Sequence, residues 1–230
     1  MNNFLTESVF FGLVLSLSSY VVGTWLKKRF KLAVLNPLLL SIIMTILVLL
    51  ITGVDYQNYY TGAKYISYLL TPATVSLAIP LYEQMEILKK NWKAVIAGIV
   101  SGVLTALCSI LFMAYLFGLG HAEYVTLLPK SITTAIGMDV SAELGGYVSI
   151  TVAVIIITGV FGNVIAETVF RIFRIKEPVA KGIALGTSAH AIGTSKAMEL
   201  GGIEGAMSSL SIVVCGILTV FGTTLFAQFL

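Results

Sequence analysis

Long apolar runs dominate the chain and predict membrane-spanning helices. Crossing a hydrocarbon core takes about 20 residues. Runs of about that length or more occupy residues 4–25, 32–54, 94–117, 147–170 and 205–229. Weaker runs, interrupted by polar residues, lie at 62–82, 125–143 and 178–199. This pattern predicts an all-α integral membrane protein, a polytopic helical bundle in which some helices are interrupted.

Composition supports the membrane class. The chain is 57% hydrophobic and 11% charged, whereas soluble domains are roughly 45–50% apolar and about 25% charged. The first run contains Glu7, lacks a basic segment before it and leads into the basic stretch KKRFK. These features are unlike those of a cleavable signal peptide, so we expect the run to be retained.

Basic residues gather in short loops between the runs, after residues 25, 82 and 170. The positive-inside rule places these three loops in the cytoplasm. The loops at 55–61 and 118–124 contain no Lys or Arg and are therefore expected outside. Because the net charge of +3 comes from such loops, it indicates a lipid bilayer as partner and no nucleic acid.

The charge map also predicts an internal symmetry. Runs 32–54, 62–82 and 94–117 form one triplet, and runs 147–170, 178–199 and 205–229 form a second triplet of opposite orientation. Inverted-topology repeats of this kind are typical of secondary transporters. We therefore expect a first membrane repeat over residues 1–118 and a second, inverted repeat over 119–230.

Segment 125–143 must then begin and end outside, as a re-entrant hairpin or a pair of half-helices does. Breaks are expected at Pro129, Gly137, Gly145 and Gly146.

The middle run of each triplet is the interrupted one. Residues 62–82 contain Pro72 and Pro80, and residues 178–202 contain the polar string GTSAHAIGTSK. The blocks AIGMDVSAELGG at 135–146 and AIGTSKAMELGG at 191–202 share AIG and ELGG. Interrupted helices at matching positions of two halves indicate a substrate site. The alternative is that the two prolines only kink a packed helix.

Four segments of the chain resemble a known family. They are LNPLLLSI at 35–42, LTPATVSLAIPLYEQ at 70–84, LLPKSITTAIGMDVSAELGG at 127–146 and GTSAHAIGTSKAMELGG at 186–202. In this order and spacing they resemble the LrgB/CidB family over essentially the whole chain.

The resemblance implies a role in the bacterial cytoplasmic membrane, as a modulator of murein hydrolase activity and autolysis. It also implies a small holin-like membrane partner of the LrgA/CidA type and a homo-oligomer. Relatives of this family carry pyruvate in bacteria and glycolate and glycerate in plastids, and the fold is expected to be related to that of inverted-repeat transporters.

A small carboxylate fits both the residues and the resemblance. Interrupted helices direct the N-termini of half-helices at the membrane midplane, where backbone N–H groups bind an anion. The candidate substrate-binding residues are Pro72, Thr74, Thr133, Thr134, Gly137, Thr187, Ser188, His190, Gly193, Thr194 and Lys196.

Helical spacing would place Thr187, His190 and Thr194 on one face. Lys196 would pair with the carboxylate, or else extend to the interface or pair with Glu199. Lys130 would draw anions inward or mark the membrane boundary.

The candidate ion-coupling residues are His190, Asp139 and Glu143. Histidine is the side chain whose unperturbed pKa lies near neutral pH, so His190 is the natural proton carrier of the three. The alternatives are a packing role for His190 and a solvated turn for Glu143.

The leading function is a secondary transporter or channel-like carrier of small monocarboxylates such as pyruvate, lactate, glycolate or glycerate, coupled to an ion. The alternative is a holin- or antiholin-like modulator of autolysis.

An enzyme is not expected, because Ser188 and His190 at i, i+2 would point to different faces of a helix and no G-x-S-x-G motif occurs. Neither a cofactor nor a metal site is expected, since the chain has only two histidines and two cysteines.

Overall fold

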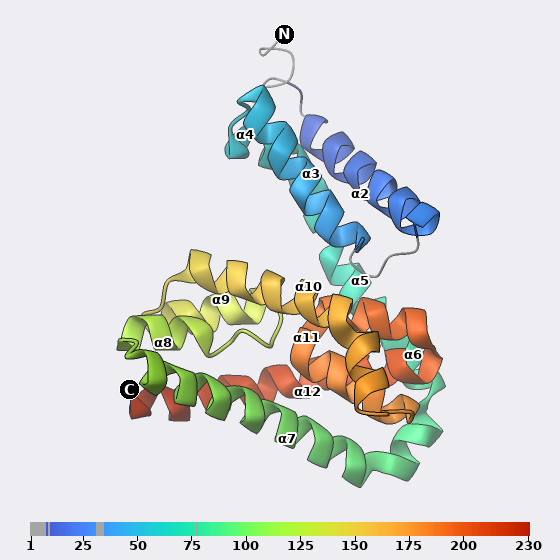
Figure 1. Cartoon of the computed structure of the whole chain (residues 1–230), viewed down its shortest axis with the longest axis vertical. Helices are drawn as coiled ribbons and strands as arrows, with labels where there is room; N and C mark the ends of the chain where they lie inside the picture. The colour runs from blue at the N-terminus through green and yellow to red at the C-terminus, as the bar shows by residue number, and fades with distance from the viewer. Residues whose placement is uncertain (1–7, 9, 31–34, 77) are drawn as a thin grey trace. The chain divides into compact units, whose positions relative to one another are not determined.

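The computed structural model describes residue 8 and residues 10–30, 35–76 and 78–230. Every regular element in these ranges is a helix, as Figure 1 shows. The chain forms two compact units, Met1–Ser76 and Leu77–Leu230. The predicted fold class, an all-α membrane protein with interrupted helices, is confirmed. The predicted repeats, 1–118 and 119–230, would be related by an inverted symmetry that compares segments of one unit with segments of the other. The repeats and their symmetry stay predictions.

The described residues of the first unit form helices α2 (Phe11–Phe30), α3 (Pro37–Thr52), α4 (Tyr56–Ser67) and α5 (Leu70–Ser76). Helix α2 packs against α3 and α4. Gly12 makes one of these contacts possible, because any Cβ there would collide with the backbone carbonyl of Tyr59. The Ser16 and Tyr59 hydroxyls lie 2.7 Å apart at the same crossing. Parts of the predicted runs 4–25 and 32–54 lie outside the described residues.

The predicted run 62–82 is interrupted, as expected. Helix α4 ends at Ser67, α5 spans Leu70–Ser76 and α6 spans Ala78–Glu83. Pro72 lies in α5 and Pro80 in α6, where each removes one backbone donor. Three short helices therefore replace the single spanning helix that an unbroken apolar run would form.

The second unit contains α6 and the longer helices. Its further elements are α7 (Met85–Phe117), α8 (His121–Leu127), α9 (Thr134–Glu143), α10 (Val148–Ile172), α11 (Pro178–Leu200), α12 (Gly202–Phe226) and η1 (Ala227–Phe229). Within the described ranges, three segments are long and apolar enough to cross a membrane: Met85–Phe117, Val148–Ile172 and Gly202–Phe229.

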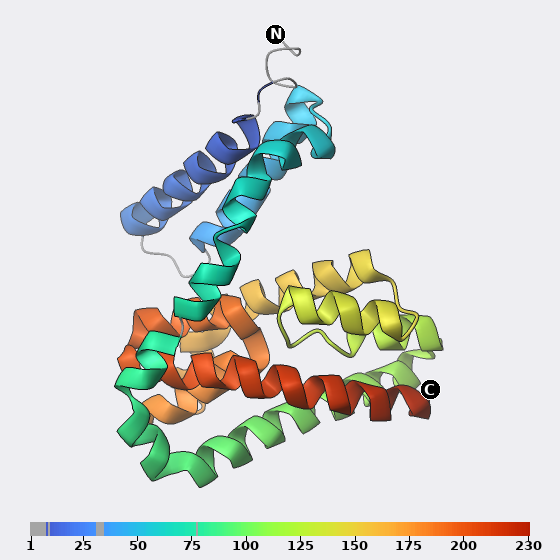
Figure 2. The ribbon, with the colours of Figure 1, turned by 180° about the vertical axis from the view of Figure 1, so that it is seen from behind.

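Helix α7 begins at Met85, nine residues before the predicted apolar run, because Glu, Leu and Lys in the added segment favour helix. Its buried stripe recurs every three or four residues, as one helical face requires. The stripe contains Val95, Ile99, Val103, Leu107 and Ile110. It belongs to the same core cluster as Met207 and Cys215 of α12. Figure 2 shows α7 and α12 running side by side across the unit.

Helices α8 and α9 form the predicted interrupted pair, joined by the non-helical segment 128–133. The pair is bound to α10 through hydroxyls, since Tyr147 N donates to Thr126 Oγ1 at 2.7 Å and Thr151 Oγ1 donates to Ser141 Oγ at 2.7 Å. Pro129 lies in the connecting turn and Gly145 has a left-handed φ of 82° where α9 ends. The expected break at Gly137 is wrong, because Gly137 is helical and lies against Ile155 of α10.

Helix α11 is interrupted at His190, whose φ of 42° and ψ of −134° are not helical. The break falls inside the polar string that predicts it, between Gly186 and Gly193. The expectation that Thr187, His190 and Thr194 share one helical face is therefore wrong, because the helix axis changes between them. After the break the chain passes so close to the first half of α11 that a Cβ on Gly193 would lie 2.5 Å from the Leu185 carbonyl oxygen.

Candidate functional site

A cavity of about 1040 Å³ lies in the second unit between α7, α10 and the first half of α11. Small residues open this space, among them Gly98 and Gly102 on α7 and Gly162 on α10. The lining also includes polar side chains of α7, α10 and α11 and of the segments that precede α9 and α11: Asn91, Ser101, Thr105, Ser109, Lys130, Ser131, Thr158, Glu177, Thr187 and Ser188. The cavity thus combines weakly polar walls with few charges, which suits a small polar ligand.

Lys130 and Ser131 bring the turn between α8 and α9 to the cavity. Lys130 N donates to Leu127 O at 3.1 Å and Ile132 N to Pro129 O at 3.3 Å, which makes the turn tight. Lys130 is half-buried, and its Nζ donates to Ser131 Oγ at 3.2 Å. No carboxylate of the described residues lies within 4.0 Å of Lys130 Nζ. The ammonium group can therefore meet the charge of an anion in the cavity.

Most hydroxyls of the lining already use their single proton. Each donates to a carbonyl of its own helix at 2.6 to 2.9 Å: Ser101 to Gly98, Thr105 to Ser101, Ser109 to Ala106, Thr187 to Ile183 and Ser188 to Ala184. A hydroxyl has one donor and two acceptor positions. These oxygens consequently remain as acceptors for a ligand hydroxyl, while Lys130 is the charged donor of the site.

Helix α10 holds the break of α11 in place. The Ile155 carbonyl lies 2.9 Å from His190 Nε2, and Asn163 Nδ2 donates to Ile192 O at 2.9 Å. Gly159 allows this approach, because a Cβ there would lie 2.6 Å from His190 Cε1. A non-glycine residue in such a conformation costs about 1–3 kcal/mol, and the surrounding contacts must maintain it.

The second half of α11 is bound to α12. Thr194 Oγ1 donates to His190 O at 3.0 Å and lies 2.7 Å from Ser208 Oγ. Both hydroxyls are buried, so the bond between them is shielded from competing water. His190, Gly193 and Thr194 thus form the buried break itself, whereas Thr187 and Ser188 just before it line the cavity.

Lys196 lies away from the cavity lining and is paired with acids. Its Nζ is 2.5 Å from Glu167 Oε1 and 3.4 Å from Glu199 Oε2. Of the alternatives for Lys196, the structure shows the pairing with Glu199, together with a partner on α10 that sequence spacing did not indicate.

The remaining predicted residues are dispersed. Thr133 and Thr134 lie at the start of α9, outside the cavity lining, and Asp139 and Glu143 are exposed along α9. Pro72 is exposed on α5 of the first unit, and the side chain of Thr74 lies outside the described part. The assignment of all these residues to a substrate or ion site stays a prediction.

Sequence reasoning missed the contribution of α7. Gly98, Ser101, Gly102 and Thr105 line the cavity from a helix that the pattern treats as a plain span. Small and hydroxyl residues three or four positions apart were the available signal, because that spacing makes one polar stripe on an apolar helix.

Comparison with known proteins assigns the chain to a family. Residues 16–229 match the LrgB-like family. The chain belongs to this family. Its LrgB relatives include the antiholin-like protein LrgB of Bacillus cereus (strain B4264) and that of Bacillus anthracis (strain A0248). Each is 36% identical over 226 residues, which cover 98% of both chains. No solved structure matches.

Both of these relatives are named as antiholin-like proteins. Together with the three apolar helices, the match identifies a membrane protein.

Proposed function

We propose that this LrgB-like chain is a multi-pass carrier of small hydroxy or keto carboxylates in the bacterial cytoplasmic membrane. The observation that carries the proposal is the cavity of about 1040 Å³ with Lys130 on its wall and acceptor hydroxyls around it. The anion would pair with Lys130, and a ligand hydroxyl would donate to the oxygens of Thr105, Thr187 or Ser188. An acid of two or three carbons fills a small part of this volume, so water would occupy the rest.

The break at His190 supports a carrier over a static binding protein. It separates two half-helices of α11, of which the first lines the cavity and the second is bound to α12 by Thr194 and Ser208. Half-helices around a substrate are a common way to alternate access to a midplane site. His190 would carry a coupling proton, with Asp139 and Glu143 as further candidates.

A second candidate is an antiholin-like regulator of autolysis, and the names of the LrgB relatives favour it. In that case the chain would act on a small holin-like membrane partner, as a homo-oligomer or within a mixed assembly. Dye release from vesicles containing such a partner tests this function. Adding the chain should lower the release if it is an antiholin.

The carrier is tested by uptake of labelled glycolate, glycerate, lactate and pyruvate into proteoliposomes containing only this chain. Lys130→Gln should raise KM, because a charge-assisted hydrogen bond contributes about 1.5–3 kcal/mol, or roughly 10- to 150-fold. Lys196→Gln is the matched control, since its ammonium is held by Glu167 and Glu199.

We expect the control to keep KM within about twofold, as loss of a partly exposed ion pair has little effect. Wild-type vesicles that take up none of the four acids would contradict the carrier. Equal KM values for wild type and Lys130→Gln would remove Lys130 from the site, but they would not contradict the carrier function.

A further inference from the structure

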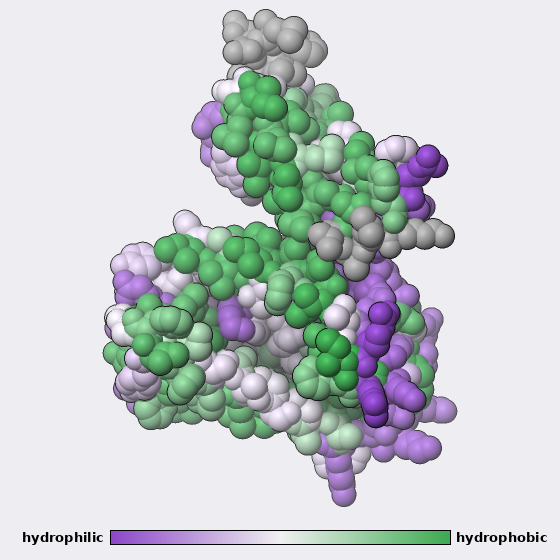
Figure 3. Space-filling view, viewed as in Figure 1, coloured by the Kyte–Doolittle hydropathy of each residue, from purple (hydrophilic) through white to green (hydrophobic). Residues whose placement is uncertain are grey.

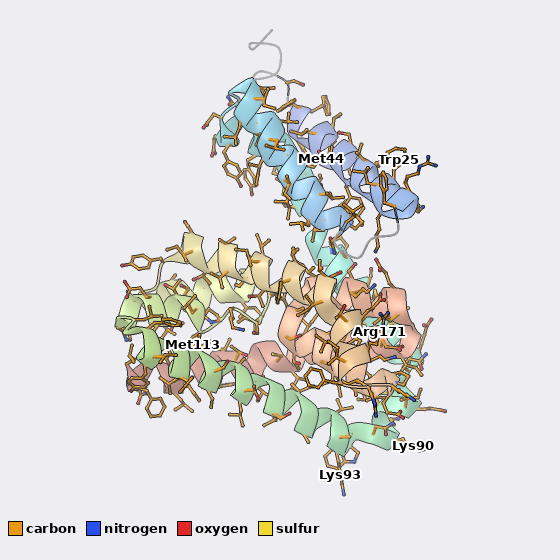
Figure 4. All side chains as sticks on the ribbon, viewed as in Figure 1. Trp25, Met44, Lys90, Lys93, Met113 and Arg171 are labelled. Atoms are coloured by element: carbon orange, nitrogen blue, oxygen red, sulfur yellow. The ribbon has the colours of Figure 1, made fainter. Side chains whose placement is uncertain are left out.

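A second, smaller concavity of about 460 Å³ lies where α10 ends and α11 begins. Four basic residues line it, Arg171, Arg174, Lys176 and Lys181. We call it the basic pocket. Figure 3 shows strongly hydrophilic residues gathered at this end of the second unit, and Figure 4 labels Arg171 there.

The charge of the basic pocket is uncompensated. Its acidic lining residue, Glu167, is paired with Lys196 at 2.5 Å. No carboxylate of the described residues lies within 4.0 Å of the basic groups of Arg171, Arg174, Lys176 or Lys181. Four cations around one concavity repel one another, and an anion with several oxygens would relieve that repulsion.

The backbone of Arg174 gives an independent reason to assign a role to this residue. Arg174 N donates to Arg171 O and Ile175 N to Phe170 O, which is the hydrogen-bond pattern of a Schellman helix end. In this motif the residue at the position of Arg174 is left-handed and is usually glycine. Arg174 takes that conformation with φ of 54°, so the chain carries an arginine where backbone energy favours glycine.

Together with the bond from Phe173 N to Val169 O, these bonds satisfy the carbonyls of Val169, Phe170 and Arg171 at the end of α10. The arginines are therefore not needed to cap the helix.

The surroundings of the pocket are apolar on one side. Its lining includes Phe170, Ile175 and Leu200. Ile172 and Phe173, in the same turn, are 68% and 71% exposed. Ile172 ends a helix apolar enough to span a membrane and Phe173 follows it directly, so these side chains would lie in lipid.

We propose that the basic pocket binds the phosphate headgroup of an anionic phospholipid. By the positive-inside rule this is the cytoplasmic leaflet, where anionic headgroups bind basic pockets between helices. The phosphate would lie among Arg171, Arg174 and Lys181, and the acyl chains along Phe173. The proposal does not depend on transport through the cavity.

Thermal unfolding of the purified full chain in detergent, titrated with phosphatidylglycerol or with phosphatidylcholine of the same acyl chains, tests the site. Phosphatidylglycerol should raise the midpoint and phosphatidylcholine should not. Arg171→Gln with Lys181→Gln should weaken phosphatidylglycerol binding about 25-fold, since each charge near an anionic surface contributes about fivefold. Lys90→Gln with Lys93→Gln is the control, because it removes two exposed charges of α7 outside the pocket (Figure 4).

Arg174→Gly separates ligand binding from folding. Glycine relieves the left-handed strain, so the lipid-free midpoint should equal or exceed that of wild type while phosphatidylglycerol binding falls about fivefold. Equal effects of the two lipids, or equal losses in the pocket and control variants, would overturn the proposal. Stabilisation by inorganic phosphate alone, matching that by phosphatidylglycerol, would also overturn the assignment to lipid.

Discussion

Gly193 is the position where one added methyl group should test the folded-back geometry of α11. An alanine Cβ there would lie 2.5 Å from the Leu185 carbonyl oxygen and 2.7 Å from Ala189 Cβ. Favourable contacts of such atoms lie near 3.5–4.0 Å. The obstructing atoms belong to the first half of α11 itself, so no flexible side chain can move aside. Overpacking of this kind costs about 1–3 kcal/mol.

Gly216→Ala is the matched control. Gly216 is also buried in a helix, but its nearest neighbour is the flexible Ile136 Cδ1 at 3.1 Å. Alanine gains about 1 kcal/mol over glycine from helix propensity at either position. The difference between the two variants therefore isolates the steric cost at Gly193.

The measurement is thermal unfolding of both variants in one detergent, followed by circular dichroism. For a chain of 230 residues, each kcal/mol shifts the midpoint by about 2–4 °C. Gly193→Ala should consequently unfold about 2–12 °C below Gly216→Ala, and its uptake rate should fall because the two halves of α11 no longer meet. A Gly193→Ala midpoint equal to or above that of Gly216→Ala would refute the close approach of the halves.

Two further predictions concern topology and coupling. A cysteine at position 121 in place of His121 should react with an impermeant thiol reagent from outside, and one at position 90 in place of Lys90 only from inside, because basic loops are retained in the cytoplasm; external labelling at 90 would reverse the assigned orientation. His190→Gln can still donate a hydrogen bond to the Ile155 carbonyl but cannot titrate. Uptake driven by a pH gradient should then disappear while exchange without a gradient survives, and unchanged pH-driven accumulation would exclude His190 as the proton carrier.

The sequence alone determined the class of protein and the location of its irregular segments. Composition left a membrane protein as the suitable class, since the hydrophobic fraction of 57% lies above that of soluble domains and the charged fraction of 11% lies well below theirs. Pro72, Pro80 and the polar string around His190 marked the segments where the structure interrupts its helices. These inferences succeeded because a missing backbone donor or a run of small polar residues acts locally, whatever the packing.

Only the tertiary structure decided which residue breaks α11 and which lysine faces the cavity. The sequence placed the break somewhere in the polar string GTSAHAIGTSK, and it left Lys196 paired either with the carboxylate or with Glu199. The break lies at His190, where the Ile155 carbonyl and Gly159 of α10 hold a strained backbone that local propensity disfavours. Residue spacing predicts which side chains share a face only within one unbroken helix. It cannot do so across this break, because contacts with other helices set the angle of the break.

The surroundings of the two lysine ammonium groups are also set by tertiary packing. Lys196 is paired with Glu167 of a different helix, and Lys130 reaches the cavity because the turn between α8 and α9 carries it there. Such contacts join residues far apart in the chain, and their partners are fixed by how helices pack rather than by the order of residues along one helix.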